Sequence, residues 1–197
     1  MKRILTLCVF LMSLTLALPS FAQDNVFENN LEMLDAFDII EASGNEQADT
    51  LVTRGEFAKY LAAALKFPPC ETTSFNDVKG SDITSVATLE QHGIVRGSRG
   101  SFLPDDIIKT TDAVVMIMRA IGYELPAQES GGYAGGYMSQ AAEADILTNI
   151  ENLSGYADLE TAVQLLCNML EANVYIVDKI VGDKFSYVRG DTFLEEY

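Results

Sequence analysis

Three segments of this 197-residue chain carry the same apolar stripe, and this repetition limits the fold more than any other feature. In each segment, apolar residues stand at offsets 0, 3, 4, 7 and 8, the spacing of one face of an α-helix. The stripes are Phe57, Tyr60, Leu61, Ala64 and Leu65; Ala113, Met116, Ile117, Ala120 and Ile121; and Ala162, Leu165, Leu166, Met169 and Leu170. The sequence therefore predicts three equivalent amphipathic helices.

A second helical pattern precedes each stripe. The paired apolar residues of these patterns are Leu31 and Leu34, Val86 and Leu89, and Met138 and Ala141. The patterns end at Asp38, Gly93 and Asp145, and two aliphatic residues follow each end. Glycine there is typical of a helix that stops in the left-handed conformation, which aspartate tolerates less well. Two helices and a loop thus recur about every 50–55 residues.

One helix pair cannot bury its own stripe, whereas three pairs can bury their stripes in a shared core. We therefore predict an all-α domain in which three helix pairs form a pseudo-threefold bundle. The expected units are residues 23–70, 71–126 and 127–175. A turn-rich connection is expected at residues 128–136, and the tail, residues 176–197, is expected to be irregular or to form one or two strands.

The first 22 residues have the three-part build of a secretory signal peptide. Lys2 and Arg3 precede an apolar run at residues 4–18, and small residues precede a cut after Ala22. The run is shorter than the ~18 apolar residues of a membrane span. We therefore expect a secreted protein that begins at Gln23 and has no membrane attachment after cleavage.

The charge of the chain excludes some kinds of partner. Cleavage after Ala22 removes two cations and no anions, so the formal net charge moves from −16 to −18. A nucleic-acid-binding protein needs a basic surface, and so does a protein that adheres to anionic lipid. Neither nucleic acid nor a membrane surface is therefore an expected partner.

The sequence contains no pattern typical of an enzyme. His92 is the single histidine and has no nucleophile or metal-ligand spacing around it, so we predict that it packs at a half-buried helix end. We accordingly expect no catalytic residues, no metal and no cofactor. Cys167 falls in a stripe helix and is expected to be a buried thiol, and a Cys70–Cys167 disulfide remains the alternative.

Several short motifs resemble the S-layer homology repeat of bacterial surface proteins. In the middle unit they are Phe75-Asn76-Asp77-Val78, Gly93-Ile94-Val95-Arg96-Gly97 and Phe102-Leu103-Pro104-Asp105. The first unit contains Val52-Thr53-Arg54-Gly55-Glu56, which is similar to the family's Ile-Thr-Arg-Ala-Glu motif. The third unit, with Gly131-Gly132-Tyr133, and the end of the chain look like those of clostridial-type surface proteins.

The resemblance implies a secreted, helical trio of repeats at the cell wall or surface of a bacterium. Such repeats bind an anionic secondary cell-wall polysaccharide without a covalent bond, often through a pyruvylated sugar. In the family, the motif arginine lies at a helix start in a groove between neighbouring repeats and holds the acidic group of the ligand.

The resemblance and the residues together indicate a ligand-binding set. Thr53 and Glu56 have the spacing of a capping box, which would place Arg54 beside a helix N-terminus whose exposed N–H groups also face the anion. The alternative is a plain capping box with a solvated Arg54. Lys109 is a partial substitute in the middle unit. Arg96 and Arg99, which flank Gly97 and Gly100, are expected at the groove entrance, and the alternative is that they are ordinary loop cations.

Two of the three units depart from the motif. Thr110 and Leu159 occupy the position of Arg54, so at most one well-formed groove is expected. Caps are still expected in these units, from Lys109 with Asp112 and from Asp158. The leading hypothesis is a wall-binding module. The alternative is a degenerate scaffold that binds other proteins of the cell envelope or spore surface, and an enzyme is the least favoured class.

Overall fold

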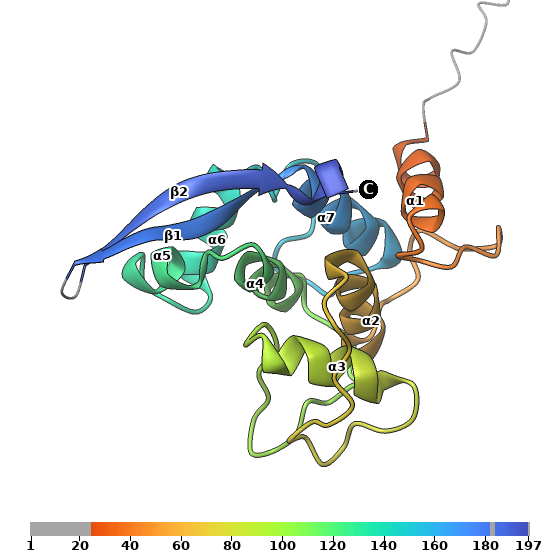
Figure 1. Ribbon diagram of the computed structural model, residues 1–197. Helices are drawn as coiled ribbons and strands as arrows, with labels where there is room; N and C mark the ends of the chain where they lie inside the picture. The colour runs from red at the N-terminus through yellow and green to blue at the C-terminus, as the bar shows by residue number, and fades with distance from the viewer. Residues whose placement is uncertain (1–24, 182–183, 197) are drawn as a thin grey trace, which may run out of the picture.

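The computed structural model describes residues 25–181 and 184–196, and the predicted signal peptide lies outside them. The protein is mostly helical, with one short two-stranded antiparallel sheet (Figure 1). The helices are α1 (Val26–Ala36), α2 (Arg54–Leu65), α3 (Asp82–Gln91), α4 (Thr110–Ala120), α5 (Glu124–Glu129), α6 (Gly135–Glu143) and α7 (Leu159–Glu171). Within the described ranges, none of the helices has the length and apolar character needed to span a membrane.

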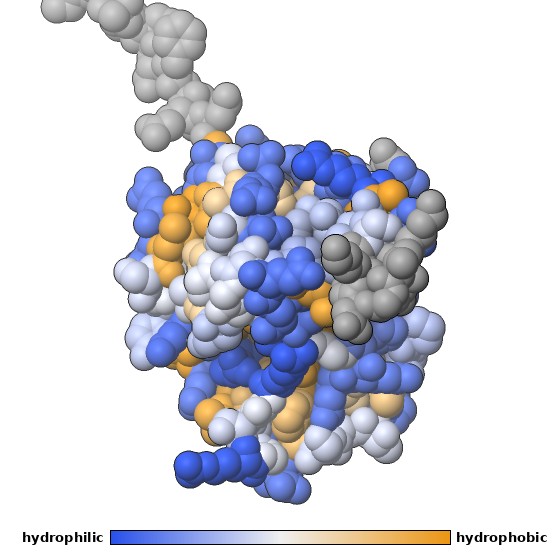
Figure 2. Space-filling view, turned by 90° about the vertical axis from the view of Figure 1, so that its left-hand side faces the viewer, coloured by the Kyte–Doolittle hydropathy of each residue, from blue (hydrophilic) through white to orange (hydrophobic). Residues whose placement is uncertain are grey.

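The three apolar stripes lie on α2, α4 and α7 and form the core. All fifteen stripe residues are buried except Tyr60 and Ala120, which are half-buried. Burying one leucine or isoleucine side chain contributes about 1.5–3 kcal/mol, so the stripes make a large contribution to stability. The visible face of the molecule is correspondingly hydrophilic, with apolar side chains in small separate patches (Figure 2).

The three first helices end as predicted, in the left-handed conformation. Asp38, Gly93 and Asp145 have φ values of 58°, 71° and 60°. The next amide in each case donates to the carbonyl five residues earlier, over 2.9 Å from Ile39, 2.9 Å from Ile94 and 3.0 Å from Ile146. This is the Schellman closure of a helix C-terminus. The aspartates thus fill the position of the glycine without changing the geometry.

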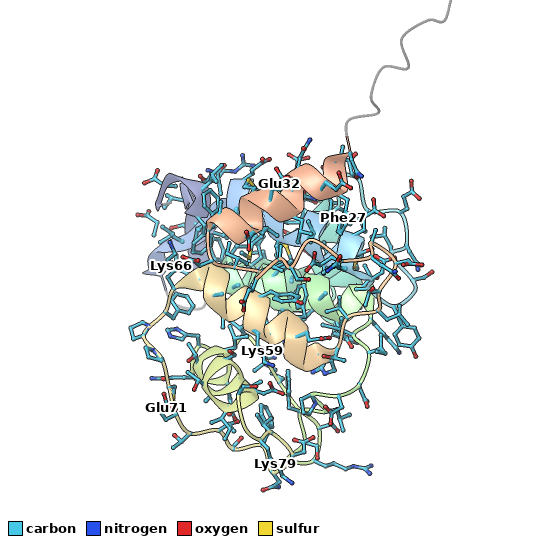
Figure 3. The ribbon with its side chains drawn as sticks, turned by 90° about the vertical axis from the view of Figure 1, so that its right-hand side faces the viewer. Phe27, Glu32, Lys59, Lys66, Glu71 and Lys79 are labelled. Carbon is cyan, nitrogen blue, oxygen red and sulfur yellow. The ribbon has the colours of Figure 1, made fainter. Side chains whose placement is uncertain are left out.

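The helices pack across the sequence units rather than within them. α1 lies against α7, α3 against α2, and α6 against α4. Figure 3 shows α1 and α2 from one side, with Phe27 and Glu32 on α1 and Lys59 on α2. Lys59 Nζ lies 2.6 Å from Asp82 Oδ1 at the start of α3. Each first helix therefore completes its burial on the second helix of a neighbouring unit.

The loops before α2, α4 and α7 meet in a closed ring of backbone hydrogen bonds. Val52 N–H donates to Ala157 C=O over 3.0 Å, Ala157 to Ile108 over 2.9 Å, and Ile108 to Val52 over 2.9 Å. All three residues are buried. Because buried backbone groups need partners, the ring fixes the three loops relative to one another.

A second set of backbone hydrogen bonds lies just outside the ring and holds the first residues of the three stripe helices in place. Arg54 N–H donates to Asp106 C=O over 2.9 Å, Thr110 to Gly155 over 3.0 Å, and Leu159 to Thr50 over 2.8 Å. Each stripe helix therefore begins against the loop of the neighbouring unit. This arrangement places Arg54 next to the loop before α4.

The structure differs from the sequence prediction after α4. The short helix α5 was not predicted, and the expected turn-rich connection at residues 128–136 includes the end of α5 and the start of α6. Proline at the third position of α5 removes no hydrogen bond there, because first-turn amides have no partner within the helix.

The tail forms a hairpin rather than an irregular segment. β1 (Asn173–Val181) pairs with β2 (Lys184–Thr192), and a 3-10 helix, η1 (Phe193–Glu196), follows. The base of β1 is fixed to the end of α4, since Tyr175 N–H donates to Ile121 C=O over 2.8 Å. Gly122 has a φ of 88°, and a Cβ there would lie 2.1 Å from the Tyr175 carbonyl oxygen. The hairpin thus depends on a glycine at this position.

Candidate functional site

A cavity of about 430 Å³ opens between the start of α2 and the loop before α4. It is lined by four of the predicted binding residues: Arg54, Arg96, Gly97 and Lys109. Arg119 of α4 adds a fourth positively charged side chain to the lining. Tyr133 and Tyr156 also line the cavity and are 65% and 53% exposed. Residues from all three sequence units therefore meet at one place.

Arg54 is held firmly at this cavity. Its Nε donates to Phe102 C=O over 3.0 Å, and its guanidinium carbon lies 4.8 Å from the centre of the Phe102 ring. Its Nη1 lies 3.6 Å from Asp112 Oδ2, and the side chain is only 17% exposed. The alternative of a freely solvated arginine is therefore wrong. The guanidinium is thus held in one orientation by Phe102 and Asp112.

The predicted capping box at the start of α2 is present. Glu56 N–H donates to Thr53 Oγ1 over 3.2 Å, and Thr53 N–H donates to Glu56 Oε2 over 2.8 Å. Neither side chain lines the cavity of Arg54, and Glu56 instead faces a neighbouring cavity. In the structure, Thr53 and Glu56 position the helix that carries Arg54.

Replacing Thr53 with alanine is expected to lower the free energy of unfolding by about 1 kcal/mol, because the Glu56 amide loses its acceptor. Urea denaturation followed by circular dichroism measures the change. Thr111→Ala is the matched control, since Thr111 lies in the first turn of α4, where the N-cap forms no side-chain hydrogen bond. Equal losses in the two variants would contradict the capping role.

The expectation that helix N–H groups face the anion is wrong. Arg54 N–H is bonded to Asp106 C=O and Gly55 N–H to Pro104 C=O, each over 2.9 Å. The Glu56 amide is used by the cap. The first-turn amides of α2 are thus occupied by the neighbouring loop and by the cap, so they are not available to an anion.

Lys109 and Asp112 do not form the predicted cap of α4. Lys109 is the N-cap residue, but its side chain makes no capping bond. Asp112 pairs with Arg54 and accepts a 2.7 Å hydrogen bond from Tyr133 Oη, which raises the pKa of Tyr133. The ammonium group of Lys109 is exposed and forms no ion pair with a residue that the structure describes.

The predicted cap of the third unit is present at the start of α7. Asp158 is the N-cap residue, and its side chain accepts a hydrogen bond from Thr161 N–H over 2.9 Å.

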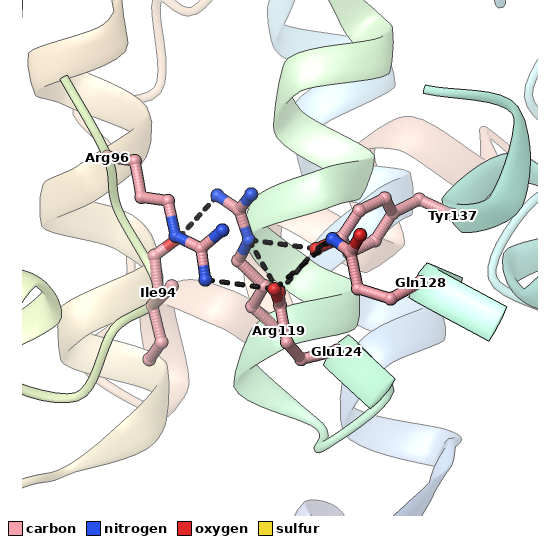
Figure 4. A network of polar contacts seen from close by, with 6 residues as sticks. All are labelled: Ile94, Arg96, Arg119, Glu124, Gln128 and Tyr137. Carbon is pink, nitrogen blue, oxygen red and sulfur yellow. Dashed lines mark hydrogen bonds and ion pairs between the residues drawn. The ribbon is translucent and has the colours of Figure 1, made fainter. Parts of the chain in front are cut away.

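Arg96 and Arg119 are joined by one carboxylate (Figure 4). Arg96 Nη2 lies 2.9 Å from Glu124 Oε1, and Arg119 Nε lies 3.0 Å from Glu124 Oε2. Arg119 Nη1 also donates to Ile94 C=O over 3.3 Å. The two guanidinium groups are thus fixed along the wall of the cavity.

Gly97 shapes the wall of the cavity. A Cβ at this position would lie 2.3 Å from Ser101 O and 2.4 Å from the Phe75 ring. The absence of a side chain lets Ser98 and Ser101 exchange backbone bonds of 2.9 and 3.0 Å around the tight turn. Arg99 lies at the tip of this turn and does not line the cavity.

Two further cavities lie at related places but have different chemistry. One, of about 370 Å³, has Leu159 where the first has Arg54 and contains Glu46 and Glu56. The other, of about 410 Å³, contains Glu151 and Glu160. Neither is lined by lysine or arginine. The position of Thr110 is fully buried, and its hydroxyl has no hydrogen-bond partner.

The sequence reasoning missed Arg119, Tyr156 and the bridging carboxylates Asp112 and Glu124. Tyr156 stands one residue before Ala157 of the backbone ring, so aligning the three loops would have found it. Arg119 lies on the stripe helix between stripe residues. No local signal showed that Glu124 joins two arginines, because one of them, Arg96, lies 28 residues away in the sequence.

The remaining candidate groups lie apart from this site. His92 is exposed rather than half-buried, and it stacks on Phe67 with 4.0 Å between ring centres. Cys70 and Cys167 are both free thiols, and burial, with a smaller effect of Glu171, raises the pKa of Cys167 to about 12. Among the described residues, no group of three His, Cys, Asp or Glu side chains is placed to hold a metal ion.

Comparisons with known proteins identify one segment of the chain. The sequence profile of the S-layer homology domain matches residues 74–109, which include the loop that forms one wall of the cavity. A surface layer protein of Brevibacillus choshinensis is 28% identical over 187 residues, covering 88% of this chain and 16% of the relative. The middle cell wall protein of Brevibacillus brevis is 27% identical over 187 residues, covering 88% of this chain and 17% of the relative.

The chain thus spans about a sixth of the length of these relatives, 16% and 17%. The S-layer homology domain and the surface-layer relatives support anchoring at the cell surface and cell wall in general. The matched domain and the two relatives are those of surface proteins.

Proposed function

We propose that this protein attaches to the bacterial cell wall by binding an anionic secondary cell-wall polysaccharide, of the pyruvylated kind, in the cavity of Arg54. The observation that carries the proposal is the convergence of Arg54, Arg96, Lys109 and Arg119 in a chain of net charge −16. A carboxylate on a sugar accepts paired hydrogen bonds from a guanidinium group. Gly97 permits the tight turn that follows Arg96, while Thr53 and Glu56 hold the helix that carries Arg54.

The fold supports the assignment of three repeats with pseudo-threefold symmetry around this site. We propose that residues 23–70, 71–126 and 127–175 are three repeats around a pseudo-threefold axis through the backbone ring of Val52, Ile108 and Ala157. The cyclic packing of α1 on α7, α3 on α2 and α6 on α4 favours this arrangement. Three clefts then lie between repeats, and one of them is basic.

A second function has a specific observation in its favour. Two of the three clefts contain glutamates and no cation, so they are poorly suited to an acidic glycan. A degenerate scaffold that binds other envelope proteins would use such clefts instead. Wall binding is favoured for the basic cleft, because its arginines are already oriented.

Purified protein without residues 1–22, mixed with bacterial wall sacculi, tests the proposal. It is expected to sediment with intact sacculi and to remain in solution after chemical removal of the secondary polymer. Free pyruvylated methyl glucoside is expected to compete, because it carries the acidic group alone. Binding that survives removal of the polymer would exclude the glycan as ligand and favour the scaffold function.

A further inference from the structure

We propose that Glu124 is a positioning residue that strengthens anion binding although it is itself negatively charged. The inference rests on the proposed function of the Arg54 cavity. Its basis is the geometry of Figure 4, where one carboxylate joins two arginines that line the cavity. Arg96 comes from the loop after α3, Arg119 from the end of α4, and Glu124 begins α5.

Glu124 is itself held by several groups. Gln128 Nε2 donates to its Oε1 over 3.3 Å, and Tyr137 Oη donates to its Oε2. Tyr137 is fully buried on α6, so the carboxylate is attached to the core. Burial raises the pKa of Glu124, but the hydrogen bonds from Tyr137, Arg119 and Arg96 lower it overall, so the group is a carboxylate at neutral pH.

Of the two arginines that Glu124 joins, Arg96 is the one whose orientation depends more on this carboxylate. Its side chain is 55% exposed, whereas that of Arg119 is 11% exposed. An exposed arginine on a loop loses rotamer freedom when it binds a ligand, and this loss opposes binding. Glu124 holds Arg96 through one nitrogen before the ligand arrives and leaves its other N–H groups available.

A positioning role of Glu124 and an effect of its charge alone predict opposite changes in affinity. If Glu124 acted only through its charge, its neutralisation would make the cavity more positive and strengthen anion binding. If Glu124 positions Arg96, the same change frees the guanidinium and weakens binding. Glu124→Gln distinguishes the two, because glutamine keeps the shape of the side chain and removes the charge.

The test titrates polymer released from sacculi into wild type and variants, each first checked for folding by urea denaturation. Glu124→Gln is expected to bind about three- to tenfold more weakly. Glu124→Asp, which keeps a carboxylate, is expected to retain more of the affinity. Glu129→Gln is the matched control, because it removes the same charge at the exposed end of α5 and is expected to bind like wild type.

A double-mutant cycle identifies the residue that Glu124 positions. In an Arg96→Ala background, Glu124→Gln is expected to have little further effect, since the positioned group is gone. Tighter or unchanged binding by Glu124→Gln, or an undiminished effect in that background, would overturn the positioning role. Failure of wild type to bind the polymer would overturn the proposed function and this inference together, whereas an unchanged Glu124→Gln beside a weakened Arg54→Ala would overturn this inference alone.

Discussion

Replacing Arg54 with alanine is expected to weaken binding of the wall polymer by roughly ten- to a hundredfold, the equivalent of one charge-assisted hydrogen bond of about 1.5–3 kcal/mol. The large effect is expected because Arg54 is oriented in advance by the Phe102 carbonyl and ring and by Asp112. Little of its side-chain freedom therefore remains to be lost on binding. Titration of released polymer into the purified protein measures the affinity.

The control for this variant is Arg99→Ala, which removes the same charge from the turn beside the cavity. Arg99 does not line the cavity, so only a small, salt-sensitive loss is expected. Because Arg54 also contacts Phe102, the free energy of unfolding of both variants is measured by urea denaturation. Equal loss of affinity in the two variants would show that net charge, rather than a specific contact at Arg54, governs binding.

Replacing Ile108 with alanine is expected to lower the free energy of unfolding by about 2–5 kcal/mol. Ile108 has 0% exposure and lies in the backbone ring that joins the three loops. The substitution keeps the backbone hydrogen bonds and removes buried methyl and methylene groups, which leaves a cavity at the junction. Urea denaturation with linear extrapolation to water measures the change in the free energy of unfolding.

Ile107→Ala is the matched control for Ile108→Ala, because the two residues are adjacent and of the same type. Ile107 is half-buried at the wall of the cavity, so it is expected to contribute about 1 kcal/mol or less. A loss for Ile107→Ala equal to that for Ile108→Ala would contradict the view that the ring lies at the centre of the core.

The local features of the fold were predictable because neighbours in the sequence create them. An apolar residue every three or four positions produces a buried helix face whatever lies opposite, and the stripes on α2, α4 and α7 follow from this. The capping box of Thr53 and Glu56 needs only residues three apart. The left-handed ends at Asp38, Gly93 and Asp145 likewise follow from the local sequence.

The candidate site was predictable only in part. Arg54, Arg96, Gly97 and Lys109 were identified from short motifs, and the structure places all of them at one cavity. The motif did not reveal that the first-turn amides of α2 are occupied by Asp106 and Pro104. That depends on a loop about fifty residues away, which local pattern does not specify.

The sequence by itself determined the helices of the three pairs, but not α5, together with the faces that the stripe helices bury and where several helices begin and end. The tertiary structure alone decided that first helices pack on neighbouring units, that three loops close a ring, and that Asp112 and Glu124 hold the arginines of the cavity. The physical reason is distance along the chain. Helix periodicity and caps act within a few residues, whereas ion pairs such as that of Arg54 with Asp112 form only after the core has brought remote segments together.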